Sequence, residues 1–304
     1  MKVAVTGASG LIGSALTASL RDSGDQVVTL VRRTPASASE IAWDPLTPMG
    51  SLAPGALDGT DAVVHLAGAG IADHRWTDSY KEEIRSSRVD GTRALSEFLA
   101  AMDQPPAVLL SGSAIGWYGD TGRQEVDESA PAGAGFLAGV VSDWEAAADL
   151  ARQAGIRVAT LRTGIVISRH GGVLARLLLP FRLGLGARLG SGTQFMSWVT
   201  LADWTGAARF LLDHQEISGP VNLTAPKPET NAAFTAALAG ALHRPALLSI
   251  PSPVLTVALG EVTSDLMTSA RVMPRVLQAA GFGFAHPDLR AALAAELQTA
   301  GSAA

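Results

Sequence analysis

The feature that most constrains the fold is a turn with three glycines near the start of the chain. Residues 3–5 form a short apolar run that is typical of a buried strand. The apolar spacing over residues 11–20 predicts a helix soon after it. Gly7, Gly10 and Gly13 occupy the connection and the first helical turn. A strand that passes through a glycine turn into a helix predicts the first crossover of an α/β sheet.

This glycine turn has the context of a dinucleotide-binding fingerprint. Gly7 allows a tight turn, Gly10 lets the backbone approach a pyrophosphate, and Gly13 lets the helix pack on the strand. The N–H groups of the first helical turn then face the phosphates. The spacing is G-x-x-G-x-x-G, and glycines gather in turns for other reasons too, so the prediction depends on the position between strand and helix. The residues expected to contact the cofactor are Gly7, Ser9, Gly10, Leu11, Ile12 and Gly13.

Strands and helices alternate through the first half of the chain. Parallel strands joined by right-handed helical crossovers predict an α/β fold with a Rossmann-like, doubly wound parallel sheet covered on both faces. The predicted strands are 26–31, 62–66, 107–111 and 157–161, a short strand is expected at 41–43, and the predicted helices are 77–102 and 136–154.

The alternation becomes less regular after about Arg162, where glycines punctuate a loop-rich segment. We expect residues 1–162 to form the cofactor-binding domain, with residues 201–223 returning to it. Residues 163–298 then form most of a smaller C-terminal substrate domain, and residues 299–304 a frayed tail. Within this half we predict strands at 195–199 and 220–223, helices at 201–212 and 231–242, and further helices to about 297. Thr230 or Asn231 caps the helix at 231–242.

Composition excludes several classes of protein. Hydrophobic residues make up 47% of the 304 residues and charged residues 17%, which is typical of a chain with a large core. The net charge of -5 argues against general nucleic-acid binding, and the absence of cysteine excludes disulfides and a cysteine nucleophile. The histidines show no metal-ligand spacing, and no apolar run reaches the length of a membrane span. We expect a cytoplasmic protein that acts on a small molecule and binds no metal, nucleic acid or membrane.

Two basic residues follow the second predicted strand, at the place where dinucleotide folds meet the adenine ribose. An acidic residue there selects NAD, whereas arginine accommodates the 2′-phosphate of NADP. This place holds Arg32 and Arg33, with no acidic residue beside them along the chain. Arginine–phosphate hydrogen bonds are charge-assisted. We therefore predict NADP(H) as the cofactor; the alternative is a pair of solvated surface arginines.

The chain resembles the extended short-chain dehydrogenase/reductases, and within them an atypical subgroup described as the NAD-dependent epimerase/dehydratase family. The resemblance covers nearly the whole chain and depends on the combination of motifs rather than on any single one. The segments that carry it are residues 6–13, 87–88, 111–114, 118–120, 144–145, 161–166, 179–186 and 192–199, together with Asp203, Asn222, Ala225, Pro226, Asn231 and Phe234.

The resemblance implies further cofactor contacts. Leu66, Ala67 and Gly68 are expected near the nicotinamide, and Glu83 and Arg88 on the following helix. Spacing alone would place those two side chains on a solvated helix face. Arg162 follows the strand at 157–161, at the edge where α/β sheets bind ligands. Extended relatives dimerise through two long helices, so a homodimer through 77–102 and 136–154 is expected.

The chain departs from the family in its catalytic residues. Typical members use Ser, Tyr and Lys, with Tyr-x-x-x-Lys on one helix, and no such pair occurs here. If Glu145 matches the family's usual glutamate, Leu137 and Val141 fill the Tyr and Lys positions, and neither carries a proton. The catalytic candidates are Ser113, which takes the family's serine position, Tyr118 and Glu145, with Lys81 more remote.

Two functions follow from this departure. The first is an oxidoreductase or epimerase-like enzyme that uses NADP(H) with non-standard catalytic residues on an unknown small molecule. The second is a protein that senses NADP(H), or regulates through binding it, with little or no turnover.

Overall fold

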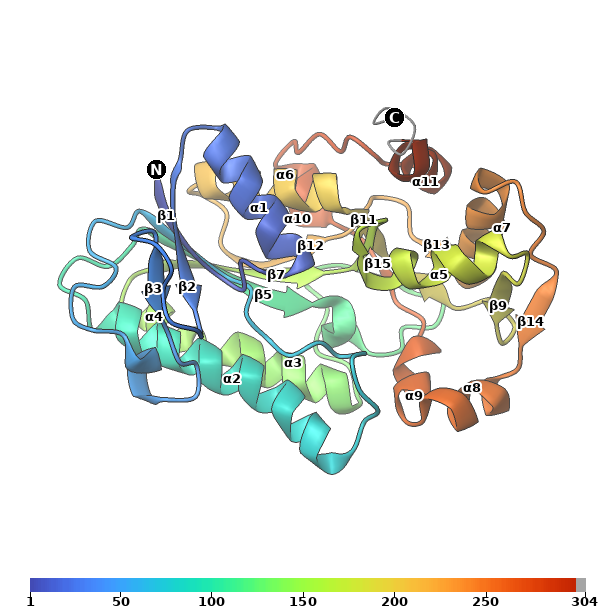
Figure 1. Ribbon diagram of the computed structural model, residues 1–304, viewed down its shortest axis with the longest axis horizontal. Helices are drawn as coiled ribbons and strands as arrows, with labels where there is room; N and C mark the ends of the chain where they lie inside the picture. The colour runs from blue at the N-terminus through green and yellow to red at the C-terminus, as the bar shows by residue number, and fades with distance from the viewer. Residues whose placement is uncertain (299–304) are drawn as a thin grey trace. The chain divides into compact units, whose positions relative to one another are not determined.

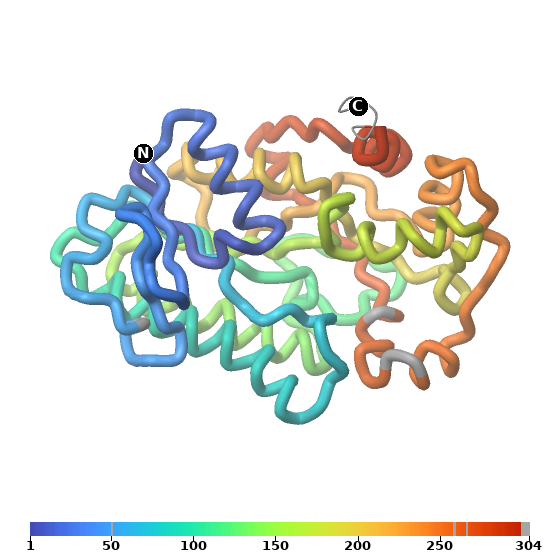
Figure 2. Tube along the Cα trace, viewed as in Figure 1, coloured from blue at the N-terminus to red at the C-terminus, as the bar shows by residue number. Residues whose placement is uncertain are grey.

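The computed structural model describes residues 1–298 (Figure 2), and the predicted tail at 299–304 lies outside the described residues. The described chain divides into two compact units. The first comprises Met1–Ala114, Gly139–Arg162 and Thr205–Val221, and the second comprises Ile115–Ala138, Thr163–Trp204 and the chain from Asn222 onward. No helix among residues 1–298 is both long and apolar enough to cross a membrane.

A seven-stranded sheet with the order β12-β7-β5-β4-β1-β2-β3 forms the centre of the first unit. The pairs β1–β2, β1–β4, β2–β3 and β4–β5 are all parallel. This arrangement confirms the predicted Rossmann-like fold. Its elements, some of which end in the second unit, are β1 (Lys2–Thr6), α1 (Leu11–Asp22), β2 (Gln26–Val31), β3 (Glu40–Ala42), η1 (Pro48–Ser51), β4 (Ala62–His65), α2 (Asp78–Ala100), β5 (Val108–Ala114), α3 (Phe136–Ala146), α4 (Asp149–Gln153), β7 (Arg157–Thr163), α6 (Leu201–Asp213) and β12 (Gly219–Leu223).

Helices cover both faces of this sheet. Helices α1 and α6 lie on one face, and α2, α3 and α4 lie on the other (Figure 1). Because both faces are covered, the central strands are apolar on both sides, and every residue of β4 is buried. Arg209 of α6 ties that helix to α1 by donating to Ser19 O at 2.9 Å.

The predicted helix at 136–154 is wrong in one respect, because the structure has two helices there. α3 ends at Ala146, and α4 begins at Asp149. Between them the N–H of Ala148 donates to Glu145 O, three residues back, at 3.3 Å. This bond tightens the turn and interrupts the regular four-residue pattern.

The second unit contains short two-stranded sheets and helices. One hydrophobic cluster of this unit joins α5, α7 and α11 around Trp198 and Phe234. Its elements are η2 (Ile115–Tyr118), β6 (Glu125–Val126), β8 (Ile165–Ser168), α5 (Gly172–Arg182), β9 (Ala187–Leu189), β10 (Phe195–Met196), β11 (Trp198–Thr200), β13 (Glu229–Thr230), α7 (Asn231–Ala241), β14 (Leu248–Ile250), α8 (Ser252–Leu259), α9 (Val262–Leu266), β15 (Arg271–Val272), α10 (Arg275–Ala279) and α11 (Leu289–Gln298).

Residues 115–138 belong to the second unit, although the sequence analysis assigns them to the cofactor-binding domain. The reason is pairing with a segment far along the chain. Strand β6 pairs with β15, and the N–H of Thr121 donates to Ser269 O at 2.7 Å. Sequence spacing carries no signal for such a long-range pair.

The predicted strand at 195–199 is two strands, divided at Ser197. β10 pairs with β13, whereas β11 pairs with β8. Between them the Ser197 hydroxyl donates to Ala270 O at 2.7 Å and accepts the N–H of Val272 at 2.8 Å. The side chain of Ser197 thus holds the β15 region beside the break.

Helix α7 resolves the two capping alternatives in favour of Thr230. Its hydroxyl accepts the N–H of Ala233 at 3.2 Å, whereas the Asn231 side chain accepts the N–H of Leu189 at 2.8 Å. We expect Thr230→Ala to lower the free energy of unfolding by about 1 kcal/mol, because an N–H of the first turn loses its acceptor. Urea denaturation followed by circular dichroism measures the loss. Thr230→Ser keeps the hydroxyl, so an equal loss in both variants would contradict the capping role.

Candidate functional site

The glycine turn is shaped by close backbone contacts. Gly7 has a φ of +68°, and a Cβ there would lie 2.7 Å from the carbonyl group of Leu66. A Cβ on Gly13 would lie 2.2 Å from Gly7 O. The N-cap of α1 is Gly10, and no side chain of the described residues caps the helix. The first N–H groups of α1 are therefore left for an external acceptor, which is the property an anion site at a helix N-terminus needs.

The loop after β4 lies against this turn. The Thr6 hydroxyl oxygen, directly before Gly7, accepts the N–H groups of Leu66 at 3.0 Å and Ala67 at 3.2 Å. The structure thus brings the predicted contact residues Leu66 and Ala67 beside the glycine turn, at the carboxyl end of β1. Crevices at the carboxyl ends of parallel strands are where α/β sheets bind ligands.

A buried series of hydrogen bonds also supports the loop after β4. His65 lies between Thr6 Oγ1, 2.7 Å from its Nδ1, and Thr92 Oγ1, 3.0 Å from its Nε2. Thr92 also accepts the indole N–H of Trp144 at 2.9 Å. Burial lowers the pKa of His65 to about 4, so the ring is neutral at physiological pH. The sequence does not predict this series of hydrogen bonds, because the residues that form it are far apart along the polypeptide.

Arg88 supports the loop from α2. Its guanidinium donates to Ala69 O at 2.9 Å and to Ile84 O at 3.0 Å, and lies 5.2 Å from the ring centroid of Trp144. Burial lowers the pKa of Arg88 to about 10, which leaves it charged at neutral pH. A Cβ on the neighbouring Gly68 would lie 3.4 Å from this side chain. Glu83, the other residue expected on this helix, is exposed.

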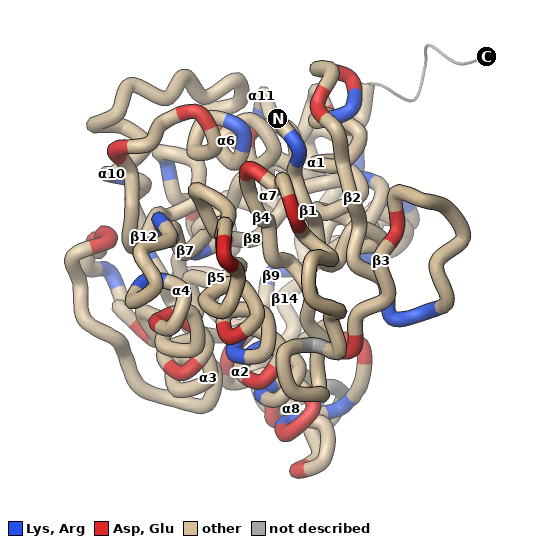
Figure 3. Tube along the Cα trace, turned by 90° about the vertical axis from the view of Figure 1, so that its left-hand side faces the viewer, with Lys and Arg blue, Asp and Glu red and all other residues tan. Residues whose placement is uncertain are grey.

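The two arginines after β2 differ in their surroundings. Arg33 donates to both carboxylate oxygens of Glu40, at 2.8 and 2.6 Å. This bond lowers the pKa of Glu40. No hydrogen bond or ion pair within residues 1–298 involves Arg32. Figure 3 shows this basic segment in blue beyond β2, on the loop that leads to β3. Glu40 lies beside the pair in space but not along the chain, so the local sequence shows no acidic partner for Arg33.

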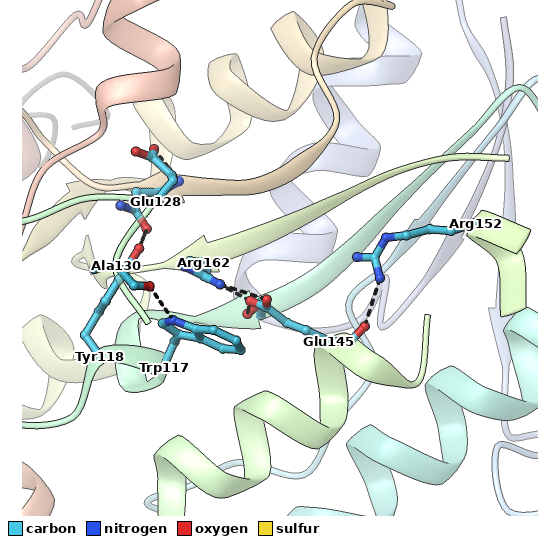
Figure 4. A network of polar contacts seen from close by, with 9 residues as sticks. Trp117, Tyr118, Glu128, Ala130, Glu145, Arg152 and Arg162 are labelled. Carbon is cyan, nitrogen blue, oxygen red and sulfur yellow. Dashed lines mark hydrogen bonds and ion pairs between the residues drawn. The ribbon is translucent and has the colours of Figure 1, made fainter. Parts of the chain in front are cut away.

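Ser113, Glu145 and Arg162 form one buried group in the first unit. The Ser113 hydroxyl donates to Glu145 Oε1 at 2.6 Å. Arg162 donates from Nε to the same oxygen at 2.8 Å and from Nη2 to Oε2 at 3.0 Å. Figure 4 shows Arg162 and Glu145 facing each other along these bonds. The structure therefore brings together two of the three catalytic candidates and adds Arg162, which was predicted as a cofactor contact.

The third candidate, Tyr118, lies in the second unit. Its buried hydroxyl donates to Asn222 Oδ1 at 2.7 Å, and Asn222 Nδ2 donates to Met273 O at 2.9 Å. Glu128 accepts the backbone N–H of Asn222 at 3.0 Å, and burial raises the pKa of Glu128. Figure 4 labels Tyr118 and Glu128 of this group. Its bonds join Tyr118 to Met273 through Asn222, which is a structural use of the Tyr118 hydroxyl.

The positions predicted to replace the family's Tyr and Lys lie on α3. Leu137 is half-buried, and Val141 is buried. Neither side chain carries a proton that could be transferred. A proton transfer in this unit would have to use other groups, and the Ser113 hydroxyl, which is bonded to the carboxylate of Glu145, is one of them.

Comparison with known proteins identifies relatives over almost the whole chain. Residues 3–223 match the NAD dependent epimerase/dehydratase family, and residues 250–296 match a domain of unknown function, DUF1731. The epimerase family protein Mb2239 of Mycobacterium bovis is 46% identical over 292 residues, which cover 96% of each chain.

Two solved structures are also similar. The crystal structure of human epimerase family protein SDR39U1 (isoform 2) with NADPH is 33% identical, has a TM-score of 0.90, and covers 98% of this chain and 99% of that one. The nucleoside-diphosphate sugar epimerase from Corynebacterium glutamicum is 37% identical with a TM-score of 0.81, and covers 98% of this chain and 58% of that one.

Proposed function

Because this chain belongs to the NAD dependent epimerase/dehydratase family, we propose that it is an enzyme of the extended short-chain type that uses NADP(H) in an oxidoreductase or epimerase reaction. The observation that carries the proposal is the glycine turn at the carboxyl end of β1, whose close backbone contacts leave no room for side chains at Gly7 and Gly13. A human relative that matches nearly the full length was crystallised with NADPH. These two observations support the same cofactor.

The described residues fit such a cofactor. The uncapped first turn of α1 supplies N–H donors for the diphosphate. Arg32, whose guanidinium has no hydrogen bond or ion pair among the described residues, supplies a cation for the 2′-phosphate. When bound, the cofactor supplies or accepts a hydride, and the protein orients it and the substrate. Ser113, bonded to Glu145, is the group proposed to meet the reacting oxygen of the substrate.

Arg32→Ala tests the choice of NADP(H) over NAD(H). We expect its Kd for NADPH to rise about 10- to 100-fold while its Kd for NADH stays within about twofold, because a charge-assisted hydrogen bond to phosphate is worth about 1.5–3 kcal/mol. Isothermal titration calorimetry with both cofactors measures the change. Arg33→Ala is the matched control: Arg33 is already bound to Glu40, so we expect a smaller loss. Wild-type protein that binds neither cofactor would refute the proposed function.

Turnover separates the enzyme from an NADP(H)-sensing protein. We expect the absorbance of NADPH at 340 nm to fall with at least one compound in a panel of carbonyl compounds. The sequence contains no Tyr-x-x-x-Lys pair, and this absence is the observation that favours the sensing alternative. Tight NADPH binding with no oxidation by any member of the panel would favour sensing or regulation.

A further inference from the structure

The bonds around Glu145 determine which way the Ser113 hydroxyl proton points. Both carboxylate oxygens of Glu145 accept N–H groups of Arg162. The guanidinium of Arg162 is a permanent cation, and it forms a buried ion pair with Glu145 across 2.8 Å. Glu145 accepts at both oxygens in this pair, and the Ser113 hydroxyl donates to Oε1 in their 2.6 Å bond.

A serine hydroxyl has a single proton, so the donation to Glu145 uses all of its donor capacity. The remaining capacity of the Ser113 oxygen is its lone pairs. No other hydrogen bond of its side chain occurs within residues 1–298. A ligand that reaches this oxygen therefore meets an acceptor and not a donor.

The position of Ser113 places this acceptor at the ligand-binding edge of the sheet. In the parallel register, Thr6 at the end of β1 pairs with His65, and His65 pairs with Ser111 of β5. Strand β4 ends at His65, whereas β5 continues to Ala114. Ser113 thus lies on the part of β5 that extends past β4, at the carboxyl edge where α/β sheets bind ligands.

We propose that the Glu145–Arg162 pair makes Ser113 a fixed hydrogen-bond acceptor, so that the site selects a substrate whose reacting group carries O–H over one that presents a carbonyl oxygen. This inference rests on the proposed function. An alcohol donates to the Ser113 oxygen, whereas a ketone of the same shape brings two acceptors together. Glu145 and Arg162 act through Ser113 and are positioning residues. The ligand class assigned to the site is an alcohol.

Matched alcohol–ketone pairs test this selectivity. The probes are cyclohexanol with cyclohexanone and glycerol with dihydroxyacetone, added to protein saturated with NADP⁺. Saturation-transfer NMR gives a Kd for each probe. We expect each alcohol to bind about 10-fold more tightly than its ketone, and Ser113→Ala to bring the ratio to about 1.

Ser111→Ala is the matched control, because it removes a buried hydroxyl on the same face of β5 that has no hydrogen-bond partner among residues 1–298. We expect this variant to keep the wild-type ratio. Equal Kd values in the wild type, a preference for the ketones, no binding by either series, or a preference that survives Ser113→Ala would each overturn the inference. NADPH affinity is measured by calorimetry on the same protein before NADP⁺ is added, so a failed alcohol preference with intact NADPH binding leaves the proposed function standing.

A double variant tests the role of the ion pair itself. Glu145→Leu with Arg162→Met removes both charges and leaves the Ser113 proton free to point at the ligand. We expect the alcohol-to-ketone ratio to fall to about 1 while the free energy of unfolding stays close to that of the wild type. A purely structural role for the pair would leave the ratio unchanged, and that result would overturn the assignment of Glu145 as a positioning residue.

Discussion

Arg162→Met is expected to lower the free energy of unfolding by about 3–5 kcal/mol, because it leaves the carboxylate of Glu145 buried without its counterion. The side chains of Arg162 and Glu145 are only 3% and 10% exposed, so water cannot replace the lost partner. Urea denaturation followed by circular dichroism measures the loss. The matched control is Arg93→Met, whose ion pair with Asp90 is about half exposed on both sides, and we expect a loss below about 1 kcal/mol there.

The double variant Glu145→Leu/Arg162→Met distinguishes two contributions to the free energy of unfolding. One is the cost of burying an unpaired charge, and the other is the net stabilisation by the ion pair. Apolar residues that replace both members of a buried pair often cost little, so we expect the double variant to fall within about 1 kcal/mol of the wild type. A double variant less stable than Arg162→Met would contradict this account. It would show that packing around the two long side chains, and not their charge, sets the stability.

The sequence predicts the parallel sheet well, because its signals are local. Buried parallel strands such as residues 62–65 are short apolar runs, and the glycine turn marks the first crossover. The helix at 201–213 is also predicted within a residue of its observed end. Each of these elements is specified by neighbours along the chain.

The second half was harder to predict for a physical reason. Helix α5 (Gly172–Arg182) falls in a segment that the sequence analysis expects to be rich in loops, because glycines surround it and Pro180 lies within it. Its buried face follows helical spacing through Leu174, Leu178 and Phe181. The glycines lie at the ends of the helix, so helical spacing was the better signal here than glycine content.

In the candidate site, too, some features can be predicted from local sequence and others depend on the fold. The glycines and the arginine pair could be found along the chain, whereas the pairing of Arg33 with Glu40 and of Arg162 with Glu145 depends on the fold. The buried contacts of His65 were missed entirely, since a histidine at the end of an apolar strand carries no distinctive pattern. Local sequence predicts which residues reach the edge of the sheet, but it does not predict which of them bind one another.

Acid is expected to destabilise the protein through His65, between pH 6.5 and pH 4. Burial lowers the pKa of His65 from 6.5 to about 4 in the folded protein. Between these values the unfolded chain binds a proton that the folded protein does not, so the free energy of unfolding falls as the pH falls. The loss approaches about 3 kcal/mol at pH 4, since each unit of pKa difference is worth about 1.4 kcal/mol.

The hydrogen bonds of His65 also predict that protonation of the ring destabilises the folded protein. Thr6 Oγ1 already accepts the N–H groups of Leu66 and Ala67, so its hydroxyl donates to His65 Nδ1, and Nε2–H donates to Thr92. A second ring proton would sit on Nδ1 and face the Thr6 hydroxyl, which would have to turn away from it. Protonation therefore disturbs the support of the loop beside the glycine turn, as well as placing a charge in the core.

Urea denaturation at several pH values between 4 and 7 measures this effect, with the same substitution at a buried and an exposed histidine. His65→Asn removes the titrating ring, so we expect its unfolding free energy to depend less steeply on pH than that of the wild type. His243→Asn replaces an exposed histidine at a φ of +53°, a conformation that Asn tolerates, and we expect the wild-type slope there. If His65→Asn kept the full slope, other groups would be responsible for the acid sensitivity, and the neutral His65 would have no part in it.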